Sequence, residues 1–312
     1  MNVLYYSILF PDVASCRNKW KECRNIQRVI CHRCTYQLHY CKEDKENYER
    51  KGCVNYQILK ANTVELGSRL SLRNWFVVIH FASTKKSFLA CEFQYQLGSS
   101  AYNLKFEVSY KFLQAIYARD ARHQLSNVNE FDEDFFSIEK IVEKNDKPLK
   151  HRCCSRKRRE ALIMTKIFPV NNSRPIEDKK PLTILQIKMF LLEYLRSKTI
   201  ETIIIEAINN QSIIDCNNST TYKKFKHLIR VHRPTAIPNK EVGMLLPFVH
   251  ISINNVKLML LKIFHIIKLI FQQSYPNVFC NKFNRKYCRE NLFFRLIFIV
   301  PTYKNQFYHS FE

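Results

Sequence analysis

Apolar side chains recur at helical spacing in the first half of the chain. From residue 72 onward they follow a period near 3.6, which predicts an amphipathic helix. The positions concerned are Leu72, Trp75, Phe76, Ile79 and His80. Residues 87–97 form a second short amphipathic stretch, residues 98–100 (Gly-Ser-Ser) predict a turn with a serine N-cap, and residues 101–117 open a further helix. The order helix, glycine-containing turn, helix is typical of a helix-turn-helix, and equally of an ordinary three-helix packing unit.

The second half of the chain reads as alternating strands and helices. Residues 190–194 predict a short strand, residues 199–208 an amphipathic helix, and residues 212–215 a buried strand that ends on an acid, Asp215. Such alternation predicts an α/β domain, and an α/β sheet binds its ligands at the carboxyl ends of its strands. Residues 256–271 are too often interrupted by lysine to span a membrane, so they predict a partly buried helix.

The charge balance favours an anionic partner. The chain has 312 residues with 50 Lys and Arg against 27 Asp and Glu, a formal net charge of +23. Nucleic acid is the commonest partner for such an excess, and a solvated basic surface is the alternative. The densest basic run, residues 150–159, fits a nuclear localisation signal, a phosphate-contacting patch or a solvated loop. We therefore expect a nuclear protein.

Cysteine spacing near the N-terminus suggests a zinc module. Six of the twelve cysteines lie in the first 53 residues, and Cys31 and Cys34 form a C-x2-C knuckle. A tetrahedral zinc site needs a second pair, for which Cys41 and Cys53 are available. The N-terminus is a poor signal peptide, so we expect a reducing compartment in which clustered cysteines indicate metal rather than disulfides. Free thiols with a broken ribbon are the alternative.

The motifs, taken in order, resemble one family. The knuckle, then LSLRNW and FQYQLGSS, resemble the N-terminal region of Merlin-type DNA transposases and their bacterial insertion-sequence relatives. EFDEDFF resembles the first catalytic strand of that family, and KMFLLEYLRSKTIETIIIEAINNQSIIDC resembles the strand, helix and second catalytic strand that follow. HLIRVHR, NKEVG and FNRKYCRENLFFRLI continue the match in family order over most of the chain.

The resemblance implies a domain plan and a chemistry. Residues 1–66 would form a zinc-ribbon-like module, residues 67–122 a helix-turn-helix, and residues 123–312 a mixed α/β ribonuclease-H-like transposase domain with a helical C-terminus. Asp132 and Asp215 would hold two magnesium or manganese ions for phosphodiester cleavage. The partner would be double-stranded DNA, with no membrane, and a homo-oligomer is expected because the family pairs two DNA ends.

Taken singly, each of these acids has a simpler interpretation. Asp132 belongs to an acidic run that would ordinarily be solvated, and Asp215 could be a helix-cap or turn residue.

The chain departs from the family pattern in ways that bear on activity. The third catalytic acid falls on His250, which supplies no negative charge, while Glu241 lies nearby in the predicted turn. Residues 137–187 contain no glycine where the family has a glycine-rich strand, so we expect an irregular segment instead of a central strand. The second zinc pair is incomplete.

Three hypotheses follow. The protein is a metal-dependent transposase using Asp132, Asp215 and His250; or a non-catalytic DNA-binding relic; or a gene product that folds poorly. The departures favour a degenerate copy, in which ancestry predicts fold and DNA binding better than it predicts turnover.

Overall fold

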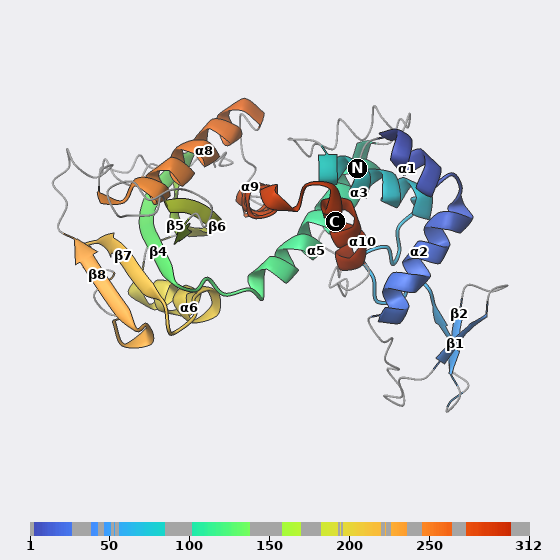
Figure 1. The fold of residues 1–312 in the computed structure, drawn as a ribbon, viewed down its shortest axis with the longest axis horizontal. Coiled ribbons are helices and arrows are strands. Elements are labelled where there is room, and N and C mark those ends of the chain that lie inside the picture. The colour runs from blue at the N-terminus through green and yellow to red at the C-terminus, as the bar shows by residue number, and fades with distance from the viewer. Residues whose placement is uncertain are drawn as a thin grey trace, which may run out of the picture. The chain divides into compact units, whose positions relative to one another are not determined.

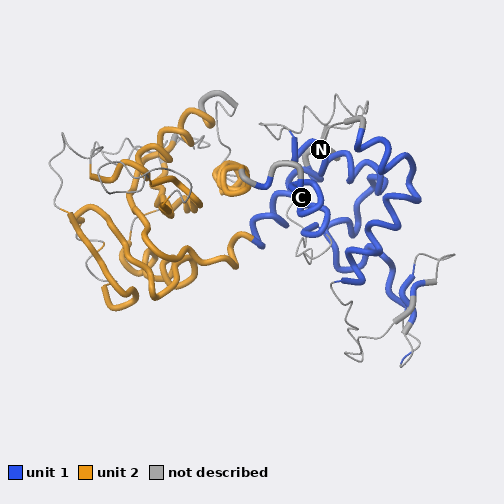
Figure 2. Tube along the Cα trace, in the orientation of Figure 1, with its two compact units in different colours: residues 1–119, 287–312 blue, residues 120–286 orange. Residues whose placement is uncertain are grey.

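The computed structural model forms two compact units (Figures 1 and 2). Unit 1 comprises Met1–Arg119 with Tyr287–Glu312, and unit 2 comprises Asp120–Lys286. The structure describes residues 3–26, 39–42, 47–50, 53, 56–84, 102–137, 158–169, 182–192, 194, 196–219, 222, 226–235, 245–263 and 273–300.

Unit 1 is mainly helical. Its described elements are α1 (Val3–Leu9), α2 (Val13–Ile26), β1 (His39–Lys42), β2 (Asn47–Arg50), β3 (Tyr56–Ile58), α3 (Leu72–Thr84), most of α5 (Tyr102–Ala121), most of the 3-10 helix η4 (Lys286–Asn291) and α10 (Leu292–Ile299). The three short strands form an antiparallel sheet in the order β1-β2-β3. The helix predicted from residue 72 is confirmed as α3, and the helix predicted from residue 101 is confirmed as α5.

Aromatic side chains hold the helices of unit 1 together. Phe293 of α10 lies edge-on to Tyr6 at 5.8 Å between ring centroids, and Phe10 meets Phe76 of α3 at 5.0 Å. The His80 ring stacks on Tyr6 at 4.6 Å. Aromatic pairs bury large apolar areas and prefer such offset and edge-to-face geometries. This explains why the apolar stripe of α3 includes a histidine.

Unit 2 is built on a five-stranded mixed sheet. Its elements are β4 (Val128–Ser137), β5 (Arg158–Pro169), β6 (Leu182–Leu192), α6 (Ser197–Ala207), β7 (Ile213–Asn217), β8 (Val231–Thr235), α8 (Pro247–Ile263) and α9 (Ser274–Asn284). The strand order is β6-β5-β4-β7-β8. The pairs β4–β5 and β5–β6 are antiparallel, whereas β4–β7 and β7–β8 are parallel. The chain is thus mixed α/β, and unit 2 is consistent with a ribonuclease-H-like fold.

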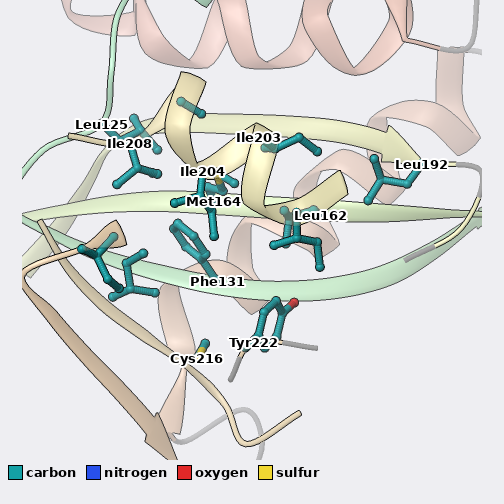
Figure 3. Close-up of a cluster of buried hydrophobic side chains, with 14 residues drawn as sticks. Leu125, Phe131, Leu162, Met164, Leu192, Ile203, Ile204, Ile208, Cys216 and Tyr222 are labelled. Atoms are coloured by element: carbon teal, nitrogen blue, oxygen red, sulfur yellow. The ribbon is translucent and has the colours of Figure 1, made fainter. Parts of the chain in front are cut away.

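Helices cover both faces of this sheet. Successive strand residues point to opposite faces, so Leu162 and Met164 join the core beneath α6, while Ala161 and Ile163 join the core beneath α8 and α9. Figure 3 shows the α6-side core, in which Ile203 and Ile204 of the helix lie over Leu162, Met164 and Phe131 of the strands. Coverage on both faces explains why β5 contains an uninterrupted apolar run from Ala161 to Met164.

The expectation of an irregular segment over residues 137–187 is wrong for the residues that the structure describes there. β5 is a 12-residue strand that pairs with β6 on one edge and β4 on the other, with one register shift between Lys166 and Ile167. β6 begins at Leu182, well before the predicted residue 190. Glycine is not needed here, because it weakens strand interiors rather than building them. The residues from Ala161 to Met164 are fully buried and pair with β4 on one side and β6 on the other.

The predicted strand ending at Asp215 is confirmed but extends further. β7 runs to Asn217, because Cys216 continues the alternation and enters the same core as Ile214. The predicted helix over residues 199–208 is confirmed as α6, and α8 covers the first part of the helix predicted over residues 256–271. Within the described residues, none of the helices is long and apolar enough to cross a membrane.

Several predictions lie partly outside the described residues. Cys31, Cys34, the second predicted helix at 87–97, the basic run up to residue 157 and Glu241 are among these. The zinc ribbon and the helix-turn-helix therefore stay predictions. Residues 287–312, which the predicted domain plan joins to the transposase domain, group with unit 1, where α10 packs on α2 and α3.

Candidate functional site

Three acids of β4 point toward α8. Glu130, Asp132 and Asp134 alternate with Phe131 and Glu133, and the period of two places the three on one face of the sheet. Each meets a different residue of α8: Glu130 meets Val249, Asp132 meets His250 and Asp134 meets Lys257. The acidic run is thus not simply a solvated stretch, since Glu130 and Asp132 are only 4% and 7% exposed.

Glu130 caps the helix that covers the site. Its carboxylate accepts a hydrogen bond from the backbone N–H of Val249 at 2.7 Å, and the N–H of Phe248 also donates to it. These N–H groups belong to the first turn of α8, where the helix itself provides no acceptors. A carboxylate at this position also complements the helix dipole. Glu130 is therefore a structural anchor, which sequence reasoning missed.

One carboxylate oxygen of Asp132 accepts a hydrogen bond, and the other lies close to a histidine ring. Asn217, the last residue of the parallel neighbour β7, donates its amide N–H to Asp132 Oδ1 at 3.0 Å. The His250 ring atom Nε2 lies 3.3 Å from Asp132 Oδ2. The structure thus brings together two of the residues predicted from sequence, Asp132 and His250, with Asn217 as the third member, which was not predicted.

A local turn fixes the orientation of the Asn217 amide. Its Oδ1 accepts the backbone N–H of Ser219 at 3.2 Å, an Asx turn two residues ahead. With the oxygen directed to that N–H, the Nδ2 group faces Asp132. The side chain therefore acts as a donor toward Asp132. Alternate residues of a strand face the same side, so Asn217, two residues after Asp215, could have been placed on the same face from the sequence.

Asp215 does not lie opposite Asp132 in the strand pair. The register of β4 and β7 sets Asp215 opposite Glu130. Its nearest cation is Arg233 of β8, at 4.0 Å, a half-exposed pair of little energetic weight. The direct neighbour of Asp132 on β7 is thus an amide rather than the acid predicted from the sequence.

Burial shifts the pKa values of Glu130, Asp132 and His250. Removal from water raises the pKa of Asp132 to about 7, and the neighbouring carboxylates of Glu133 and Asp134 act in the same direction. Burial likewise raises the pKa of Glu130 to about 7, although the N–H groups of α8 oppose this shift. The pKa of His250 is lowered, chiefly by burial. Low local polarity therefore disfavours charge on Glu130, Asp132 and His250.

The donor set around Asp132 does not fit a pair of divalent cations. Two catalytic ions lie about 3.5–4 Å apart and share carboxylate ligands, and magnesium or manganese prefers oxygen ligands that carry charge. Asp132 is accompanied by an amide already bonded to Ser219 and by an imidazole. Throughout the described part of the chain, no three His, Cys, Asp or Glu side chains are grouped so that they could hold a metal ion.

The segment leading into the edge strand β8 is basic and open to solvent. Lys226, His227 and Arg230 precede β8 and are exposed, and Arg233 within it is 59% exposed. Arg233 pairs in register with Asp215, whereas Lys226 and Arg230 lie before the start of β8, at the end of the strand pair away from Asn217. HLIRVHR, singled out in the sequence, spans part of this segment.

Comparison with known proteins gives a weak structural likeness. No family model and no curated protein matches the chain. Among solved structures, the chain is similar to the Mos1 transposase paired-end complex with left transposon end, at 9% sequence identity and a TM-score of 0.24, covering 74% of this chain and 80% of that chain. A TM-score this low carries no argument, so the agreement with a ribonuclease-H-like fold rests on the order and direction of the strands in unit 2.

Proposed function

We propose that this protein is a non-catalytic, DNA-binding derivative of a DDE transposase. The observation that carries the proposal is the composition of the cluster at Asp132, whose partners are Asn217 and His250. A two-ion phosphodiester reaction needs several carboxylates to offset the ionic charge. Here the other acids of β4 on the same face are engaged elsewhere, Glu130 with the N-terminus of α8 and Asp134 with Lys257.

DNA binding is supported by charge. The chain carries a formal net charge of +23, and its motifs follow the order of Merlin-type transposases. Phosphate contacts by Lys and Arg release condensed counterions, so affinity for duplex DNA should fall with added salt. Within unit 2, we assign part of this binding to Lys226 and Arg230, which are exposed beside β8.

The binding test compares two substitutions of exposed cations. Lys226→Ala with Arg230→Ala should reduce the slope of log affinity against log salt by about one for each phosphate that the variant no longer neutralises. Lys198→Ala, an exposed lysine of α6, is the matched control and should leave the slope unchanged. Fluorescence anisotropy with a labelled duplex measures both. Wild-type binding that does not respond to salt would remove DNA binding from the proposal.

The catalytic test uses Asp132→Asn as its reference. Wild-type protein incubated with supercoiled plasmid and excess manganese should nick no faster than this variant. Nicking that exceeds the variant and disappears on chelation would contradict the non-catalytic assignment and restore Asp132 as a catalytic residue.

A further inference from the structure

Position 217 decides which chemistry the site around Asp132 can support. β7 supplies two polar side chains to the face beneath α8, Asp215 and Asn217. Asp215 faces Glu130 across the strand pair, whereas Asn217 reaches Asp132. The residue type at position 217 therefore determines whether Asp132 meets a hydrogen-bond donor or a second carboxylate.

We infer that Asn217 and His250 close the site around Asp132 without a divalent cation, and that Asn217 is the residue that excludes it. The inference rests on the proposed function and deepens its non-catalytic part. Asn217 donates to one oxygen of Asp132 at 3.0 Å, while His250 lies 3.3 Å from the other. A cation entering here would have to break the hydrogen bond from Asn217, and within the described part of the chain it would not meet a group of three potential ligand side chains.

The Ser219 hydrogen bond makes the closure specific to an amide. The Asn217 oxygen is held by the backbone N–H of Ser219 at 3.2 Å, which leaves the NH2 group to face Asp132. An aspartate at position 217 could keep the Ser219 bond through one oxygen. Its other oxygen would then face the Asp132 carboxylate at hydrogen-bond distance. Above pH about 7, where Asp132 is ionised, two like charges this close repel strongly in a buried site. A divalent cation between them would remove that repulsion.

The substitution Asn217→Asp should therefore create a requirement for a cation. At pH about 8, in buffer freed of divalent cations before the protein is added, the variant should melt at a lower temperature than wild type, and in excess MnCl2 its melting temperature should recover. Wild type should melt at the same temperature in both solutions. Titration of Mn2+ followed by electron paramagnetic resonance should show about tenfold or more tighter binding to Asn217→Asp than to wild type, since ligand charge sets affinity for hard cations.

A double variant separates the site from general electrostatics. Asn217→Asp combined with Asp132→Asn keeps the new acid and removes its neighbour, so its melting temperature should not respond to Mn2+. Wild-type binding of Mn2+ that Asp132→Asn abolishes would overturn the inference. It would also be overturned by an Asn217→Asp protein that ignores Mn2+, or that stays unfolded with and without it, because the cation should restore the fold.

The two proposals fail in different ways. Absence of the expected Mn2+ response with salt-dependent DNA binding intact would remove only the inference about Asn217. The expected Mn2+ response without salt-dependent DNA binding would remove only the DNA-binding part of the proposed function.

Discussion

The two faces of the unit 2 sheet are both covered by helices, yet β4 gives them different residues. Toward α6 it presents Phe131, which is fully buried among aliphatic side chains. Toward α8 it presents Glu130, Asp132 and Asp134, and each has a partner. Burial of apolar area stabilises a fold without regard to partner, whereas a buried acid is tolerated only when its hydrogen bonds are provided.

The two faces therefore have different roles in the structure. The α6 face is ordinary core packing. The α8 face carries buried acids, which are met by a helix N-terminus, an amide and a lysine. This pattern is what the proposed non-catalytic function requires of the α8 face.

The largest expected effect concerns the α6 face. Ile204→Ala should lower the free energy of unfolding of unit 2 by about 2–5 kcal/mol, because it removes a fully buried side chain and leaves a cavity. Ile205 follows it on the same helix and is 59% exposed, against 1% for Ile204. Ile205→Ala should change the free energy by no more than about 0.5 kcal/mol. Urea denaturation measures both, and equal losses would contradict the packing described for α6.

The next effect concerns the cap on α8. Glu130→Ala should destabilise unit 2 by about 1–3 kcal/mol at neutral pH, since it leaves the N–H groups of Val249 and Phe248 buried without an acceptor. Glu130→Gln keeps one acceptor oxygen and should lose less. The midpoints of urea denaturation curves measure the loss of stability in each variant. A glutamine variant as unstable as the alanine variant would show that charge, and not hydrogen bonding, anchors the helix.

A gain in stability is expected at Asp132. Its pKa is raised by burial from 3.8 to about 7, so the folded protein binds this proton more tightly than the unfolded chain. Protonated Asp132 therefore contributes its whole stabilisation of the folded state below pH about 4, and this contribution is lost as the pH rises to about 7. Asp132→Asn should stabilise the protein by about 1–2 kcal/mol at pH about 8 and by much less near pH about 4. Melting curves at the two pH values test this, and an equal effect at both would refute it.

The smallest effect is expected at the outer end of the same face. Lys257 pairs with Asp134, and both side chains are partly exposed. Solvent screens such a pair, so Lys257→Ala should cost no more than about 1 kcal/mol. The loss should shrink further in high salt. A loss comparable to that of Glu130→Ala would show that the ion pair holds α8 on the sheet more firmly than its exposure suggests.

Local patterns predicted much of the fold. The spacing of apolar residues, with a period of 3.6 or 2, located α3, α5, α6 and β7. A helix or strand with one buried face repeats its apolar residues at that spacing, so the pattern is visible in a short stretch of sequence. Prediction failed over β5 and the start of β6, where the absence of glycine was given too much weight and the apolar run too little. Of the candidate site, Asp132 and His250 were found and lie in contact, while Asn217 and Glu130 were not singled out.

The sequence by itself determined the mixed α/β composition, the alternation of acids along β4 and the large positive charge. Only the tertiary structure decided which polar groups meet. Asn217 and Asp132 lie 85 residues apart in the chain and become neighbours through the parallel pairing of β4 with β7. Val249 and Glu130 are separated by 119 residues and meet only because α8 covers that face. Strand register and helix placement result from burial summed over the whole domain, so no local pattern specifies such partners.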